Sequence, residues 1–145
     1  MHHPRALISW ICMAALLPGC GGTPADVVSN REASAKACEE AEQAFKKGDF
    51  QTAKSKFEAA FEIGNLQLDL YAEALVKHAV CMAGVGEVEQ AARKLDELEQ
   101  QPIPEDLILS ARSFVLEKQG KKRDAKLAWS RARKINRMVP KFDFK

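Results

Sequence analysis

Apolar residues recur at helical spacing along most of the chain. Between residues 30 and 137 they return every three or four positions, which places their side chains on one face of a helix. The periodic segments are separated at Gly48, Gly64, Gly86, Pro102 and Gly120. No segment alternates apolar and polar residues over the length of a strand. The pattern therefore predicts an all-α protein of about six helices.

Ser29 and Glu32 indicate where the first helix begins. A serine followed three residues later by a glutamate fits a capping box, in which each side chain accepts a hydrogen bond from a free backbone N–H. This pair predicts a helix that starts at Asn30. The preceding residues 21–26 include two glycines and a proline and are predicted to form a short flexible linker.

Three glycine-containing turns share one sequence pattern, so the chain contains an internal repeat. Gly48, Gly86 and Gly120 are each followed five residues later by an alanine. Nine residues after each glycine stands Phe57, Leu95 or Trp129, and seven before it stands Ala41, Ala79 or Ser113. The intervals between the glycines are 38 and 34 residues, the period expected of stacked repeat units.

This spacing resembles the tetratricopeptide repeat, which has a period of 34 residues. The resemblance covers residues 30–137; it is strongest in the first unit and departs in the third, where Lys122 replaces the usual aromatic residue. It implies an α-solenoid of three helix-turn-helix units, in which each unit covers the apolar face of its neighbour. A plain helical bundle with accidental spacing is the alternative.

In the repeat family the first helix of each unit lines a concave groove that binds a partner. Matching positions here are Cys38, Glu42, Phe45 and Lys46 in the first unit; Glu73, Val76, Val80, Ala83 and Gly84 in the second; and Leu107, Ser110, Phe114, Glu117 and Lys118 in the third. An apolar centre with charged margins suits an extended peptide or an amphipathic helix. Alternatively, Phe45, Val80 and Phe114 simply pack within the array.

The N-terminal segment predicts export and a lipid anchor. Residues 1–19 have a short basic start followed by an apolar core, as in a signal peptide. Their last three residues and the next one form Leu17-Pro18-Gly19-Cys20, which resembles the lipobox of bacterial lipoproteins. The resemblance implies cleavage before Cys20, attachment of diacylglycerol to its thiol, and a tether over residues 20–29. Its location would be a bacterial membrane, the outer membrane facing the periplasm where the host has one. An ordinary secretory signal or an uncut anchor is the alternative.

Charge is unevenly distributed, although the net charge is only +2. Residues 118–145 hold eleven Lys and Arg against Asp124 and Asp143, whereas residues 20–117 are acidic overall. The predicted basic surface comprises Lys121, Lys122, Arg123, Lys126, Arg131, Arg133, Lys134 and Arg137. It suits anionic lipid, a polyanionic wall polymer, an acidic partner or the acidic half of a second copy. Nucleic acid does not fit an exported protein, and a solvated last helix is the plainer alternative.

The segment 138–145 is too apolar for an inert end, because it contains Met138, Val139, Phe142 and Phe144. The last helix of a repeat array has no following unit to cover it. We therefore expect this tail to fold over the uncovered face of that helix, or else to dock onto a partner.

The side chains carry little sign of catalysis. His78, the one histidine after residue 19, lies mid-helix and is predicted to be a core or half-buried residue. No histidine–nucleophile pair, phosphate-binding loop or metal-ligand spacing accompanies it. Cys38 and Cys81 are predicted to be buried thiols, with a disulfide between them as the alternative. We expect no enzymatic activity, no cofactor and no metal.

With 145 residues, 46% of them hydrophobic and 29% charged, the chain has the size of one domain and the composition of a folded one. The sequence predicts a membrane-anchored, non-catalytic adaptor that binds a peptide or protein. In layout it resembles small repeat lipoproteins that assist assembly of pili, secretion channels or outer-membrane proteins. The alternative is a structural envelope lipoprotein whose basic end binds anionic lipid or wall polymer. Self-association is compatible with either function.

Overall fold

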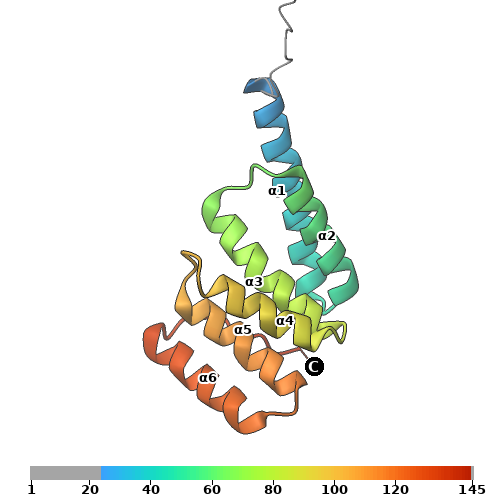
Figure 1. The fold of residues 1–145 in the computed structure, drawn as a ribbon. Coiled ribbons are helices and arrows are strands. Elements are labelled where there is room, and N and C mark those ends of the chain that lie inside the picture. Colours follow the sequence, from blue (N-terminus) through green and yellow to red (C-terminus); the bar gives the residue numbers. More distant parts are fainter. Residues whose placement is uncertain (1–23, 145) are drawn as a thin grey trace, which may run out of the picture.

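The computed structural model describes residues 24–144, and these form six α-helices without any strand (Figure 1). The helices are α1 (Pro24–Lys46), α2 (Phe50–Ile63), α3 (Leu68–Gly84), α4 (Val88–Leu98), α5 (Glu105–Lys118) and α6 (Lys122–Ile135). The predicted all-α class is confirmed. None of these six helices is both long and apolar enough to traverse a bilayer. The predicted signal peptide, the lipobox and Cys20 lie outside the described residues.

The first helix begins earlier than the sequence predicts. It starts at Pro24 rather than Asn30, so Ser29 lies inside the helix and cannot cap it; the predicted capping box is wrong. The part of the predicted linker from Pro24 onward is helical. Proline is favoured at the first helical position, since its φ is already helical and its missing N–H has no partner there. Asp26 adds an acidic group in the first turn, which complements the helix dipole.

The three repeated glycines end three helices in the same way. Gly48, Gly86 and Gly120 have φ of 74°, 95° and 76°, a left-handed conformation that glycine adopts without strain. The residue after each glycine donates a backbone hydrogen bond to a carbonyl five positions earlier, as Asp49 does to Ala44. These are the bonds of a Schellman motif, so the sequence repeat is also a repeat of local structure.

The helices pack as three consecutive pairs. α1 packs on α2, α3 on α4 and α5 on α6, while α2 also contacts α3 and α4 contacts α5. The first helices of the pairs meet as well, because α3 contacts both α1 and α5 (Figure 1). Small residues such as Ala41, Ala79 and Ala111 are completely buried, which lets the helix axes approach closely.

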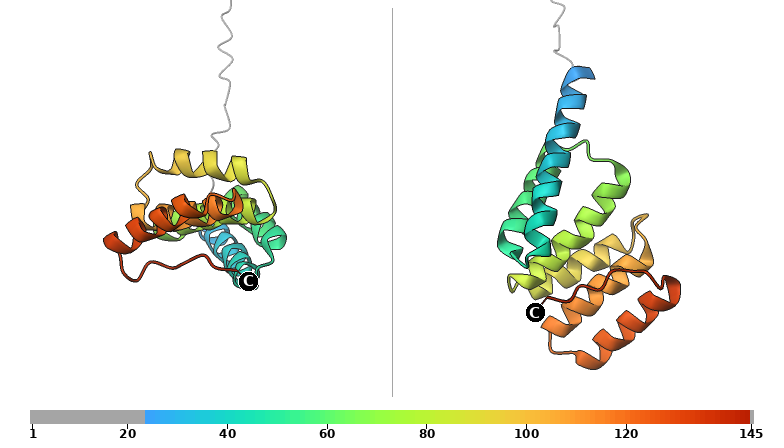
Figure 2. Two further views of the ribbon diagram at one scale, coloured as in Figure 1. Left: turned by 90° about the horizontal axis from the view of Figure 1, so that it is seen from below. Right: turned by 180° about the vertical axis from the view of Figure 1, so that it is seen from behind.

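The N-terminal part of α1 extends beyond the other helices (Figures 1 and 2). The side chains of residues 25–33 are exposed, and Ser34 is the first buried one. Val27 and Val28 are among these exposed residues. This part of α1 is therefore an arm that leads away from the packed helices.

The C-terminal segment does not lie where the sequence predicts. Residues 136–144, which we call the tail, leave α6 and cross α5 to reach the C-terminal end of α1 (Figure 2). Val139 and Phe142 are buried along this path. Leu127 and Ile135 of α6 stay about half exposed, at 52% and 54%, so the predicted cover over the last helix is wrong. The reason is that the phenylalanines of the tail pack against other phenylalanines near the end of α1.

Candidate functional site

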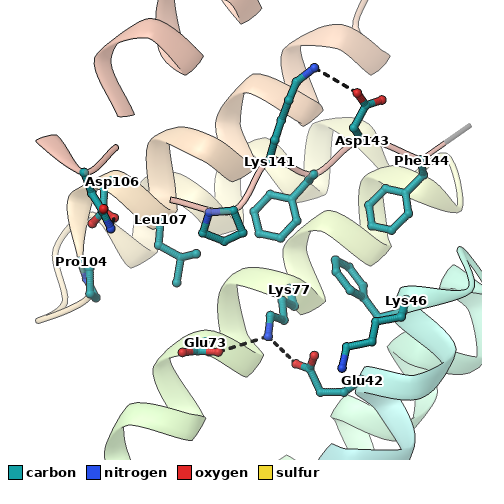
Figure 3. A pocket seen from close by; sticks show the side chains of 14 residues that line it. Glu42, Lys46, Glu73, Lys77, Pro104, Asp106, Leu107, Lys141, Asp143 and Phe144 are labelled. Atoms are coloured by element: carbon teal, nitrogen blue, oxygen red, sulfur yellow. Dashed lines mark hydrogen bonds and ion pairs between the residues drawn. The ribbon is translucent and has the colours of Figure 1, made fainter. Parts of the chain in front are cut away.

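The tail lies on a surface contributed by the first helix of each pair (Figure 3). We call this surface the inner face and define it by Glu42 and Phe45 of α1, Glu73 and Lys77 of α3, and Leu107, Ser110 and Phe114 of α5. The predicted groove positions Glu42, Phe45, Glu73, Leu107, Ser110 and Phe114 thus come together on it. The structure adds Lys77 and the tail itself, which the sequence did not indicate.

Hydrogen bonds attach the tail to α5 at two points. Asn136 donates from Nδ2 to Asp106 Oδ2 at 2.8 Å, near the start of α5. One turn further along, Ser110 donates from Oγ to the carbonyl oxygen of Pro140. Ser110 is completely buried, so its hydroxyl depends on this backbone carbonyl for a partner. The hydrogen bond also fixes where the tail crosses the helix.

Beyond Pro140 the tail is held by aromatic contacts. Phe142 meets Phe45 edge-on, with ring centroids 5.8 Å apart. Phe144 contacts Phe45, Phe50 and Phe114 at centroid distances of 5.0, 4.8 and 5.7 Å, each time with nearly perpendicular rings. Such pairs contribute about 0.5–1.5 kcal/mol each beyond the burial of their area. Five phenylalanines from α1, α2, α5 and the tail therefore form one cluster.

A cavity of about 540 Å³ remains between the tail and the helices (Figure 3). Its apolar wall includes Leu107, Pro140 and Phe142, and its charged wall includes Glu42, Lys46, Glu73 and Lys77. The tail therefore occupies the inner face without filling it. The mixture of apolar and charged walls suits an amphipathic ligand.

Lys77 is the central charge of this wall. Its Nζ lies 2.6 Å from Glu42 Oε1 and 3.1 Å from Glu73 Oε2, while its side chain is only 15% exposed. Burial alone would lower the pKa of Lys77, but the hydrogen bonds and charges of Glu42 and Glu73 outweigh burial and raise it. The ammonium therefore stays charged and links α1 to α3.

The remaining predicted groove residues divide into two groups. Lys46 lines the cavity, and Glu117 and Lys118 line a smaller neighbouring pocket beside Phe114 and Phe144. Cys38, Val76 and Val80 are buried, with at most 1% exposed, and Ala83 is buried too, so none of the four can contact a partner directly. Gly84 lies against Phe50.

The two cysteines are free and buried, as the sequence predicts. Burial raises the pKa of the Cys81 thiol to about 12. The pKa of Cys38 is also raised, chiefly by burial and then by the carboxylate of Glu42. Because the thiolate is the reactive form, neither thiol is activated as a nucleophile.

His78 is half-buried, which confirms its predicted environment. Its Nε2 lies 3.2 Å from Glu58 Oε1, and its ring packs edge-on against Phe61. Burial lowers the pKa of His78, and Glu58 offsets part of that effect. Within residues 24–144, no group of three or more His, Cys, Asp or Glu side chains is placed to hold a metal ion.

All eight residues of the predicted basic surface are exposed, and they lie on and beside α6. None of the eight forms an ion pair with a carboxylate of the described chain. Exposed apolar side chains accompany them, among them Leu127, Ile135 and Met138, the last 88% exposed. This surface lies at the opposite end of the molecule from Pro24, where the arm begins (Figure 1).

No protein-family model, curated protein or solved structure matches this chain. The geometry of the inner face and of the basic surface therefore carries the functional argument.

Proposed function

We propose that the protein is a lipid-anchored, non-catalytic adaptor of the tetratricopeptide type, whose inner face binds a peptide or protein partner in assembly of the bacterial envelope. Support for the repeat type comes from the three equivalent helix ends and from the consecutive helix pairs. Support for the anchor comes from the lipobox at residues 17–20.

The observation that carries this proposal is that the inner face holds an extended peptide, namely the tail. It offers a buried hydroxyl to a peptide carbonyl and an aromatic surface to peptide side chains. These are the elements of groove recognition, in which backbone hydrogen bonds set the position of a peptide and pockets for its side chains select it.

The chemistry of the described side chains favours binding over catalysis. The thiols of Cys38 and Cys81 are buried with raised pKa values. His78 is paired with the carboxylate of Glu58 on α2. An adaptor needs no activated thiol or imidazole, so these buried and paired groups are compatible with a binding function.

The proposed anchor and the arm of α1 act together. Only residues 21–23 separate Cys20 from the start of α1. The stretch from Pro24 to Ala33, which precedes the first buried side chain, adds about 15 Å at about 1.5 Å per residue. A lipid on Cys20 would thus hold the packed helices close to the membrane, among the proteins of that compartment.

Site-specific photo-crosslinking in cells tests the adaptor function. A photoreactive residue at Glu73 lies on the inner face, and one at Glu97 on α4 is the control; their side chains are similarly exposed, at 56% and 64%. We expect one dominant adduct from Glu73 and none of the same mass from Glu97. Equal labelling from both positions, or no adduct at Glu73 at normal expression, would overturn the adaptor function.

The basic surface supports a second candidate, a structural envelope protein that binds anionic lipid or wall polymer. Exposed cations that form no ion pair within the described chain, next to exposed Leu127, Ile135 and Met138, are typical of surfaces that bind anionic membranes. Because α6 lies far from the arm, the basic surface would contact a different membrane or wall layer from the membrane that holds the lipid anchor. Salt-sensitive binding to anionic vesicles or isolated wall, lost on reversing the charges of Arg133, Lys134 and Arg137, would favour this function.

A further inference from the structure

The tail shows which kind of segment the inner face accepts. We propose that the inner face binds, in trans, an extended segment of another protein that carries two phenylalanines at alternate positions, and that the tail is a displaceable internal copy of this ligand. The inference rests on the proposed adaptor function and specifies the partner's chemistry. It is carried by the contacts of Phe142 and Phe144, by the attachment of the tail through side chains and not through a backbone ladder, and by the unfilled cavity.

Alternation of the phenylalanines follows from the geometry of an extended chain. Side chains two residues apart point to the same side, and the one between them points away. Phe142 and Phe144 both contact Phe45, whereas Asp143 is exposed and pairs with Lys141 on the tail itself. The inner face therefore recognises the two rings and the carbonyl of Pro140. The residues between them do not contribute to this recognition.

The aromatic requirement follows from the receiving side chains. Phe45 and Phe114 meet Phe144 edge-on, an arrangement that needs a ring on both sides. An aliphatic side chain could fill part of the same space but would lose these contacts. Lys118 lies 5.1 Å from the centre of the Phe114 ring and so adds a cation beside this aromatic surface.

The tail can leave without breaking regular structure. Its backbone hydrogen bonds within residues 24–144 are local, from Asn136 to Ala132 and from Val139 to Asn136. It is joined to the inner face by side chains and by the bond from Ser110 to Pro140. Displacement therefore exchanges one set of side-chain contacts for another and leaves the six helices intact.

The cavity favours an incoming segment over the tail. About 540 Å³ between the tail and the helices is lined by Leu107 and Phe142 on one side and by Glu42 and Lys77 on the other. A segment with a larger side chain directed into this space would bury more apolar area than the tail does. The tail has the advantage of covalent attachment, equivalent to an effective concentration on the order of millimolar.

Fluorescence anisotropy with a labelled peptide tests the proposal. The peptide has the sequence of residues 138–145, MVPKFDFK, and is titrated into the full chain and into its Phe142→Ala/Phe144→Ala variant. We expect saturable binding to the variant and about 10- to 100-fold weaker apparent binding to the unchanged chain, because the tail occupies most of its sites. The control peptide MVPKFFDK has the same composition with adjacent phenylalanines and should bind at least about 10-fold more weakly.

Two results would overturn the proposal. The first is no saturable binding to a variant whose circular dichroism and unfolding transition show a folded protein; if the double variant is unfolded, Phe144→Ala alone is used. The second is a concentration-dependent dimer that requires Phe142, since the occupant in trans would then be a second copy rather than another protein. Continued crosslinking from Glu73 despite failure of the peptide would leave the adaptor function standing and remove only the alternate-phenylalanine ligand.

Discussion

The ring of Phe50, at the start of α2, lies directly against Gly84, at the end of α3. A Cβ added to Gly84 would come within 2.3 Å of Phe50 Cγ, closer than side-chain atoms can approach. The same Phe50 ring also contacts Phe144 of the tail, at a centroid distance of 4.8 Å. The glycine therefore makes room for the ring on which the tail rests.

Gly84→Ala is expected to lower the free energy of unfolding by about 1–3 kcal/mol, because the methyl group overpacks against Phe50. This would occur even though alanine is favoured over glycine inside a helix by about 1 kcal/mol. Urea denaturation measures the change. In the Phe50→Ala background the same substitution should cost much less. An equal cost in both backgrounds would show that the ring is not what excludes the methyl group.

Phe142→Ala should destabilise the protein by about 2–4 kcal/mol, because it removes a buried ring from the aromatic cluster. Lys141→Ala, at an exposed neighbouring position, should stay within about 0.5 kcal/mol. Thermal and urea unfolding of the two variants give the comparison. Similar small effects for both would mean that the tail adds little to the fold.

Lys77→Met should cost about 1–3 kcal/mol, since it leaves Glu42 and Glu73 without their shared cation. Adding Glu42→Gln to Lys77→Met should recover part of the loss, because it removes one of the unpaired charges. Chemical denaturation of the single and double variants measures this recovery. A double variant that is less stable than Lys77→Met would contradict the role assigned to the pair.

Acidification should destabilise the fold in part through His78. Burial lowers the pKa of the folded imidazole below its ordinary value of 6.5, so the unfolded chain takes up the proton at higher pH. The stability is then complete above that ordinary value and falls as pH drops through it toward the folded pKa. Between about pH 7.5 and 5.5 the urea midpoint should fall more for the unchanged protein than for His78→Gln. Equal falls of the urea midpoint in the two proteins would show that groups other than His78 cause the pH dependence.

Cys20→Ala tests the proposed anchor. Loss of the thiol removes the attachment point for the acyl chains, each of whose buried methylenes contributes about 0.8 kcal/mol to membrane affinity. The unchanged protein should sediment with membranes and partition into detergent, whereas the variant should not. Membrane association that survives this change would point to an uncut N-terminal segment or to the basic surface.

Local features of the fold could be predicted from sequence, and long-range ones could not. Gly48, Gly86 and Gly120 mark helix ends because their conformation is a property of a few neighbouring residues. The predicted start of α1 is wrong because Ser29 has the sequence of a cap, while Pro24 allows the helix to begin about a turn and a half earlier.

The candidate site can likewise be predicted only in part from the sequence. The resemblance to the repeat family implies that Glu42, Phe45 and Phe114 share one surface; in the structure Glu42 and Phe45 line the cavity and Phe114 contacts Phe144 of the tail. The position of a residue along a helix does not reveal whether a neighbouring helix covers its side chain. Val76 and Val80 are therefore predicted in the groove, although both are buried. The path of the tail depends on contacts between residues far apart in sequence, and no local pattern encodes it.

The contact between Phe142 and Phe45 joins the last of the three consecutive helix pairs to the first and so closes a loop. In an open array each unit touches only its neighbours, so the end units can fray independently and stability is a sum of local terms. Here the tail returns from the last helix pair to the first, at a centroid distance of 5.8 Å from Phe45. While the tail is in place, opening of the first pair is therefore coupled to the last, and amide exchange in α1 and α5 should share one opening event. Cutting the loop at the tail would give the two ends separate exchange rates.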